Sequence, residues 1–267
     1  MQYTFSFLGS SISYSIAGKK GPTVLLLHGF GEDHLVFHQQ VDALLHHCRL
    51  VLPDLPGSGE STYAREVCSS IDTMAHAMHA LMQEVCDEPF VVLGHSMGGY
   101  ITLAMAEQMP SRIAAFGLLH STAFADSEEK KTNRKKSVEF IEQNGVFPFI
   151  KTTIPGLFGE VFAADNPTVV GQLIERGRTF SPQALIAYYE AMIARPDRTR
   201  VLQSAEVPVL FLIGDIDKPA PMADVLQQVH LAKNSEVKIL RNTGHMGMLE
   251  QPQLTSETIT AFIDRLN

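Results

Sequence analysis

The chain has 267 residues, of which 45% are apolar and 19% charged, and its formal net charge at pH 7 is -8. This composition is typical of a folded globular domain, and the negative charge disfavours nucleic acid and anionic membrane surfaces as partners. No apolar run approaches the roughly 18 residues that a membrane-spanning helix needs. The three cysteines lack metal-ligand spacing and indicate a reducing, cytoplasmic location.

The strand pattern changes along the chain. Tyr3–Phe7 and Ile12–Ile16 alternate apolar and polar side chains, which predicts an antiparallel hairpin with one solvated face. The later candidates are short runs of consecutive apolar residues, as expected for strands that helices cover on both faces. These runs are Val24–Leu27, Leu50–Leu52, Phe90–Leu93, Ala114–Leu119, Val209–Ile213 and Val237–Leu240. Together the candidates predict a mostly parallel, eight-stranded sheet.

Segments of helical length separate these strands, and the alternation predicts a doubly wound α/β fold. They are Phe37–His47, Ile71–Cys86, Met97–Met109, Met222–Leu231 and Leu254–Leu266. Residues 121–204 contain no buried strand run, and we expect them to form a helical cap inserted into a core domain made of residues 1–120 and 205–267. At the start of the cap, Asp126 with Glu129 three residues later predicts a helix N-cap.

A G-x-S-x-G motif lies between the strand at Phe90–Leu93 and the following helix, with Ser96 at its centre. A nucleophilic serine must project from a sharp turn, and Gly94 and Gly98 remove the side chains that would collide there. The turn also directs the first amides of the helix toward developing negative charge. The motif therefore predicts that Ser96 is a catalytic nucleophile.

A serine hydroxyl needs a base, and His245 is the strongest candidate because it follows the last strand in a loop close to the C-terminus. The base in turn needs an orienting carboxylate from a loop that lies between serine and histidine in chain order. Asp215 and Asp217 both follow the strand Val209–Ile213, and the residues alone do not separate them. His95 is interpreted as a supporting residue that points away from the turn.

Five stretches give the chain a resemblance to the α/β-hydrolase superfamily, in its capped, cofactor-free esterase and lactonase-like branch. They are Leu27-His28-Gly29-Phe30-Gly31, Pro53 to Ser61, the Ser96 turn, Gly214-x-x-Asp217 with Pro221, and Gly244-His245. The resemblance implies that Asp217, rather than Asp215, orients His245. It also implies an oxyanion hole made by the backbone amides of Phe30 and Met97, and neither a cofactor nor a metal.

The expected cap is rich in phenylalanine and tyrosine, and a minority of these rings should line an acyl pocket. The candidates are Phe124, Phe147, Phe149 and Tyr188. Phe147 and Phe149 flank Pro148, which is expected to break a helix and fold that segment back over Ser96.

These features predict a serine hydrolase that cleaves carboxylic esters of small to medium apolar acyl groups through an acyl-enzyme. The same triad also suits a lactonase, a carbon-carbon bond hydrolase or a perhydrolase. A different class, a ligand-binding receptor with vestigial turnover, stays open as an alternative. The expected partner is a small ester or lactone.

Overall fold

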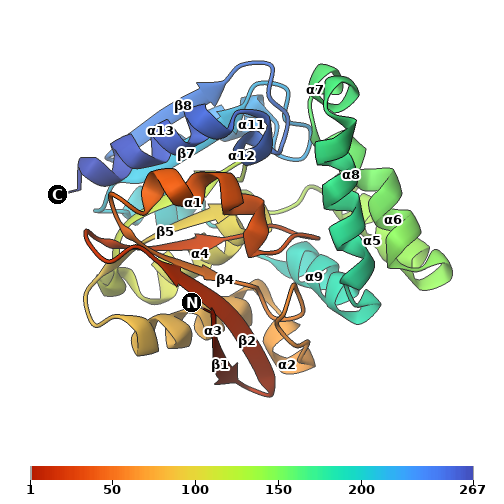
Figure 1. Cartoon of the computed structure of the whole chain (residues 1–267), viewed down its shortest axis with the longest axis horizontal. Coiled ribbons are helices and arrows are strands. Elements are labelled where there is room, and N and C mark those ends of the chain that lie inside the picture. The colour runs from red at the N-terminus through yellow and green to blue at the C-terminus, as the bar shows by residue number, and fades with distance from the viewer. Residues whose placement is uncertain (1, 267) are drawn as a thin grey trace.

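The computed structural model describes residues 2–266 and contains one sheet of eight strands. Their order across the sheet is β1-β2-β4-β3-β5-β6-β7-β8 (Figure 1). β1 pairs antiparallel with β2, β2 pairs antiparallel with β4, and all the other pairs are parallel. The strands are β1 (Gln2–Phe7), β2 (Ser10–Ala17), β3 (Thr23–Leu27), β4 (Arg49–Pro53), β5 (Phe90–His95), β6 (Ile113–Leu119), β7 (Val209–Gly214) and β8 (Ser235–Leu240).

Burial follows the sequence pattern. Every residue of β5 and β7 is buried, whereas β1 has none that is fully buried. Continuous apolar runs therefore occupy the covered centre of the sheet, and the alternating hairpin lies at its edge. The predicted doubly wound, mostly parallel sheet is confirmed.

Helices flank the sheet: α1 packs against α13, and α3 packs against α4, which also contacts β3, β5 and β6 (Figure 1). The predicted helix at Met222–Leu231 is wrong in length, because α11 ends at Leu226 and turns follow it. The helices of this layer are α1 (His38–Leu44), α2 (Arg65–Cys68), α3 (Ile71–Val85), α4 (Met97–Gln108), α11 (Met222–Leu226), α12 (Gly247–Glu250) and α13 (Pro252–Asp264).

Between β6 and β7 the described chain forms helices and 3-10 turns without any strand, and most of these helices lie beside the core (Figure 1). Its two ends meet where the Arg198 amide donates a hydrogen bond of 2.8 Å to the carbonyl of Ala123. The helices are α5 (Glu128–Asn144), α6 (Val146–Thr153), α7 (Glu160–Asp165), α8 (Pro167–Arg176), α9 (Pro182–Ala194) and α10 (Thr199–Ser204).

Two local predictions in this segment are wrong. Ser127, not Asp126, caps α5, because the Ser127 hydroxyl accepts from the amide of Lys130. Asp126 is buried and pairs instead with Arg134 at 2.6 Å and Arg195 at 3.0 Å. Both carboxylate oxygens of Asp126 are thus engaged by arginines, Oδ2 by Arg134 and Oδ1 by Arg195.

Pro148 does not break a helix. It is the third residue of α6, in the first turn, where a missing amide hydrogen costs no helical hydrogen bond. The break lies earlier, at Gly145, whose φ of 82° only glycine adopts readily. Among residues 2–266, no helix combines the length and apolar character that crossing a membrane requires.

Candidate active site

Ser96 lies at the sharp turn between β5 and α4, with φ of 51°. A Cβ on Gly94 would lie 2.2 Å from the backbone of Gly98, and a Cβ on Gly98 would lie 2.3 Å from the carbonyl oxygen of Leu27. No side chain fits at either position. The two glycines therefore permit a strained serine that is only half-buried.

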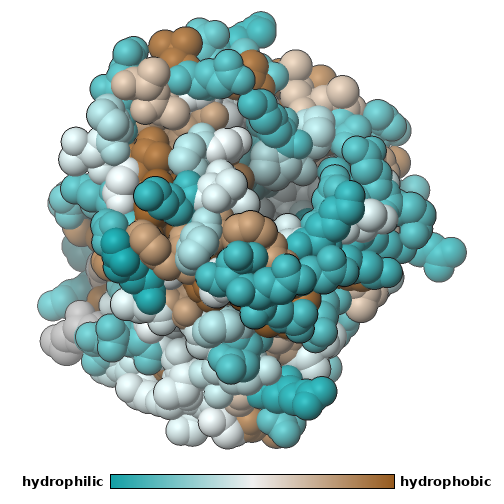
Figure 2. Space-filling view, turned by 90° about the vertical axis from the view of Figure 1, so that its right-hand side faces the viewer, coloured by the Kyte–Doolittle hydropathy of each residue, from teal (hydrophilic) through white to brown (hydrophobic). Residues whose placement is uncertain are grey.

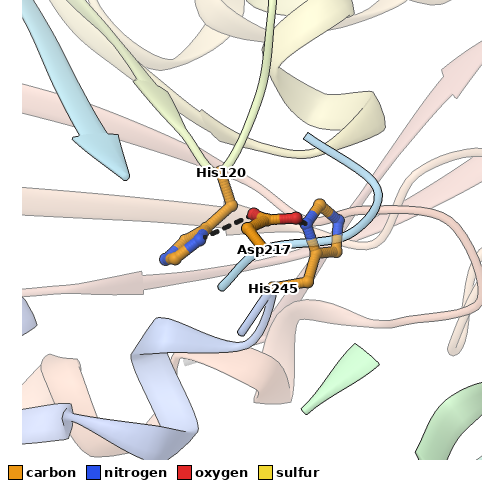
Figure 3. Close-up of side chains that lie close together, drawn as sticks. All are labelled: His120, Asp217 and His245. Atoms are coloured by element: carbon orange, nitrogen blue, oxygen red, sulfur yellow. Dashed lines mark hydrogen bonds and ion pairs between the residues drawn. The ribbon is translucent and has the colours of Figure 1, made fainter. Parts of the chain in front are cut away.

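His245 and Asp217 meet at the carboxyl edge of the sheet, from the loops that follow β8 and β7 (Figure 3). Nδ1 of His245 lies 2.9 Å from each carboxylate oxygen of Asp217. Because a carboxylate only accepts, Nδ1 carries the proton and Nε2 is left as the basic nitrogen. Within residues 2–266 no group hydrogen-bonds to that Nε2.

Burial alone would raise the pKa of the Asp217 carboxyl, but the imidazoles of His245 and His120 outweigh it and hold the pKa well below its usual range. Asp215 lies elsewhere: it accepts from the Thr243 amide at 3.2 Å and lies 3.9 Å from Arg241. Of the two carboxylates considered from the sequence, only Asp217 contacts the imidazole.

His120 was not singled out in the sequence. It directly follows β6, is fully buried, and places Nδ1 3.1 Å from Oδ2 of Asp217. Figure 3 shows the Asp217 carboxylate between the two imidazoles. The only signal in the sequence was a polar ring at the end of an apolar strand, which does not say what the ring contacts.

His95 also takes a more specific place than expected. Its Nδ1 lies 2.9 Å from the Glu32 carboxylate, and its Nε2 lies 2.9 Å from the backbone oxygen of His245. The same Glu32 oxygen accepts from the amide of Gly29 at 2.7 Å. This buried pair joins the loop after β3, the Ser96 turn and the His245 loop.

The pair is best described as an ion pair, because both nitrogens of His95 face groups that only accept. Burial opposes charge on both residues. Even so, the Glu32 carboxylate raises the pKa of His95, and the His95 imidazole lowers the pKa of Glu32.

Glu250 fixes the His245 loop from the other side. Its buried carboxylate accepts from the amides of Gly244 at 3.0 Å and Gly159 at 2.9 Å, and burial raises its pKa. The His245 amide donates to the Leu157 oxygen at 2.7 Å. The segment before α7 is therefore hydrogen-bonded directly to the His245 loop.

Phe30 lies three residues after the end of β3, and Met97 is the first residue of α4, directly after Ser96. In the described chain neither amide donates to a protein acceptor. Gly31, with φ of 69°, lets the loop turn just after Phe30. The oxyanion role expected of these two amides stays a prediction.

The aromatic residues expected to line a pocket are divided. Phe149 packs edge-on against Phe30, with ring centroids 6.3 Å apart. Phe147 instead lies under the Arg178 guanidinium, whose central carbon is 3.6 Å from the centroid of the Phe147 ring. Tyr189, which is not among the expected pocket residues, stacks on Phe30 with ring centroids 4.2 Å apart.

The other two candidates do not join this cluster in the same way. Tyr188 is completely buried, and its hydroxyl bonds to Pro56 and Ser58 in the loop after β4, which leaves no exposed surface for a substrate. Its ring still reaches Phe30, with centroids 6.4 Å apart. Phe124 is half-buried, and its backbone oxygen accepts from Arg195.

His120, Asp217 and His245 also come close enough together to be considered as metal ligands. A tetrahedral zinc with bonds of about 2.1 Å separates its ligand atoms by roughly 3.4 Å. The nitrogen–oxygen distances of 2.9 and 3.1 Å are shorter and fit protons shared between donors and acceptors. The cluster is a hydrogen-bonded acid with two imidazole donors.

Comparisons with known proteins agree with this architecture. A pimeloyl-(acyl-carrier protein) methyl ester esterase of Aeromonas hydrophila is 26% identical over 248 residues, covering 91% of this chain and 96% of that protein. Monoacylglycerol lipase ABHD6 of Bos taurus is 24% identical over 273 residues, covering 94% and 78%. An esterase from Thermogutta terrifontis superposes with a TM-score of 0.92 at 26% identity, covering 100% and 99%.

An enol-lactonase from Burkholderia xenovorans LB400 shares the fold, with a TM-score of 0.90 at 22% identity and coverage of 98% and 100%. The family model described as alpha/beta hydrolase fold matches residues 22–187, more than half of the chain. On these grounds, the chain belongs to the alpha/beta hydrolase fold family.

Proposed function

We propose that this protein is a serine esterase with Ser96 as nucleophile, His245 as base and Asp217 as the orienting acid. The observation that carries the proposal is the pairing of His245 Nδ1 with Asp217 at 2.9 Å, which leaves Nε2 basic and without a partner in the described chain. The strained turn that presents Ser96 supports it.

In the proposed reaction, Ser96 Oγ attacks the ester carbonyl while His245 Nε2 takes the hydroxyl proton. The amides of Phe30 and Met97 hold the oxyanion. As the carbon-oxygen bond breaks, His245 returns the proton to the departing alcohol, and an acyl group remains on Ser96. Water then attacks this acyl-enzyme and gives a proton to His245, which passes it to Ser96 Oγ as the bond to the acyl group breaks and the acid leaves.

We further propose that the substrates are soluble esters with apolar acyl groups of roughly four to eight carbons. Each buried methylene contributes about 0.8 kcal/mol, or about fourfold in kcat/KM, until the pocket is full. The aromatic cluster of Phe30, Phe149 and Tyr189 supports an apolar pocket. Figure 2 shows hydrophobic residues only as separate patches among hydrophilic ones on the viewed face, unlike a surface that docks on lipid.

The nucleophile is tested by a fluorophosphonate probe and a p-nitrophenyl ester series from acetate to laurate. The probe should label the wild type but not Ser96→Ala, and turnover in that variant should fall by roughly 10⁴ or more. Ser111→Ala, at an exposed serine, is the matched control and should behave like the wild type. Labelling of Ser96→Ala would contradict the assignment.

The same assays separate the rival functions. A receptor-like protein would release one product equivalent and then turn over very slowly, whereas an esterase should turn over repeatedly. A lactone assayed beside the esters measures ring opening, and a lower kcat/KM for the lactone than for the best ester is expected. A flat profile from acetate to laurate would contradict the proposed acyl pocket.

A further inference from the structure

His120 makes one of the hydrogen bonds that hold the acid of the proposed triad. Its fully buried ring places Nδ1 3.1 Å from Oδ2 of Asp217, on the other side of the carboxylate from His245 (Figure 3). Oδ1 of Asp217 accepts from the amide of Ala220 at 2.8 Å. Without His120, the only hydrogen bond left to Oδ2 in the described chain would be the one from His245 Nδ1, which Oδ2 shares with Oδ1.

Two unfavourable features meet at His120. Its φ of 51° is in the left-handed region, which a residue with a side chain rarely adopts. Its Nε2 is buried and has no hydrogen-bond partner within residues 2–266. A backbone outlier and an unpaired polar atom both cost stability, and both are more common at functional sites.

The surroundings determine where the proton lies. Asp217 only accepts, so Nδ1 of His120 is protonated. Nε2 faces Gly247, where a Cβ would lie only 2.3 Å away, and meets no acceptor that could hold a second proton. Burial lowers the pKa of His120 despite the neighbouring carboxylate, which fits a neutral ring.

We propose that His120 is a positioning residue for the catalytic acid: a neutral imidazole protonated on Nδ1 that fixes the Asp217 carboxylate in the orientation His245 requires. The inference rests on the function proposed above. It assigns His120 no contact with the substrate. Its effect passes through Asp217 to the imidazole, so it should change kcat more than KM.

Three variants test this role. His120→Leu removes the donor, His120→Asn keeps an N–H near the position of Nδ1, and Gly247→Ala leaves His120 in place but pushes on its ring. We expect His120→Leu and Gly247→Ala to lower kcat about 10- to 100-fold, as loss of a hydrogen bond to a charged group does, with KM within about twofold. His120→Asn should recover most of the loss.

His79→Leu is the matched control, because His79 in α3 also has a buried Nε2 without a hydrogen-bond partner in the described part of the chain but lies outside the proposed active site. It should keep the wild-type kcat. Equal losses of kcat in His120→Leu and His120→Asn would overturn the proposal. The shape of the side chain, rather than its N–H donor, would then determine kcat. A His120→Leu variant with the kcat of the control would also overturn it.

Nitrogen-15 NMR of the histidine side chains tests the proton position without a substrate. At pH 7, His120 should show a protonated Nδ1 and a bare Nε2, in the wild type and equally in Ser96→Ala. A protonated Nε2 would overturn the inference. If the protein hydrolyses no ester, the proposed function fails, yet the spectrum still decides whether His120 is the Nδ1–H donor to Asp217.

Discussion

Replacing Glu32 by glutamine tests whether a buried ion pair holds the loops of the active site together. One oxygen of Glu32 accepts both from Gly29 at 2.7 Å and from His95 at 2.9 Å. A glutamine nitrogen at that position would face the Gly29 N–H, donor against donor. A glutamine oxygen there accepts both hydrogens, but His95 then keeps two protons without a counter-ion.

Deprotonation of His95 in the Glu32→Gln variant is also unfavourable. If His95 loses the Nε2 proton, its lone pair faces the His245 oxygen at 2.9 Å. Breaking a buried ion pair by removing one charge costs about 3 to 5 kcal/mol. With a urea m-value of about 3 kcal/mol/M, the midpoint of unfolding should fall by about 1 to 1.7 M.

Equilibrium urea unfolding at pH 7 measures this loss. Glu60→Gln, at an exposed carboxylate, is the control and should stay within about 0.5 kcal/mol of the wild type. Adding His95→Gln to Glu32→Gln removes both charges and should recover part of the loss. If Glu32→Gln unfolds at the midpoint of the control, the ion-pair reasoning is refuted.

Three further predictions concern the acid, the acyl pocket and the start of the cap. Asp217→Asn should lower ester turnover by roughly 10⁴ by favouring the wrong imidazole tautomer, whereas steady-state kinetics of Asp215→Asn should show a much smaller loss. Phe149→Ala should shift the acyl chain-length optimum, because this ring contacts the predicted oxyanion loop, while Phe147→Ala should leave the p-nitrophenyl ester profile unchanged. Burial alone would raise the pKa of Asp126, but the charges of its two arginine partners outweigh it and lower the pKa. Its ionised form thus stabilises the fold above about pH 4, and that stability is lost as the pH falls through the lowered pKa. Asp126→Asn should therefore be less stable than wild type in urea at pH 7, with a smaller difference at pH 3; a difference that grows at pH 3 would contradict this sign.

The sheet and the Ser96 turn were predictable because their signals are local. An apolar run identifies a covered strand, and the two glycines beside Ser96 describe the turn within five residues. The supporting contacts are not local. Glu32 and His95 are 63 residues apart, and His120 and Asp217 are 97 apart, so only the three-dimensional path of the chain reveals them.

The cap aromatics show the same limit. Phe147 and Phe149 are the same residue type and lie in the same helix, yet Phe147 packs against Arg178 and Phe149 against Phe30. The orientation of the helix decides which ring faces the core, and composition does not reveal that orientation. The helix start was misassigned for a related reason. Asp126 fits a capping pattern, but Arg195, which directly follows α9 and is distant in sequence, pairs with its carboxylate.

The bond between Ala123 and Arg198 makes the helical insertion look modular, since the chain leaves and re-enters the core at nearly one point. The segment around Leu157 contradicts that view. Excising the insertion would remove the acceptor of the His245 amide and one of the donors to Glu250. A truncated core would thus have a loosened His245 loop even with all three residues of the proposed triad intact, and grafting another cap would require keeping residues 157–159 as part of the host.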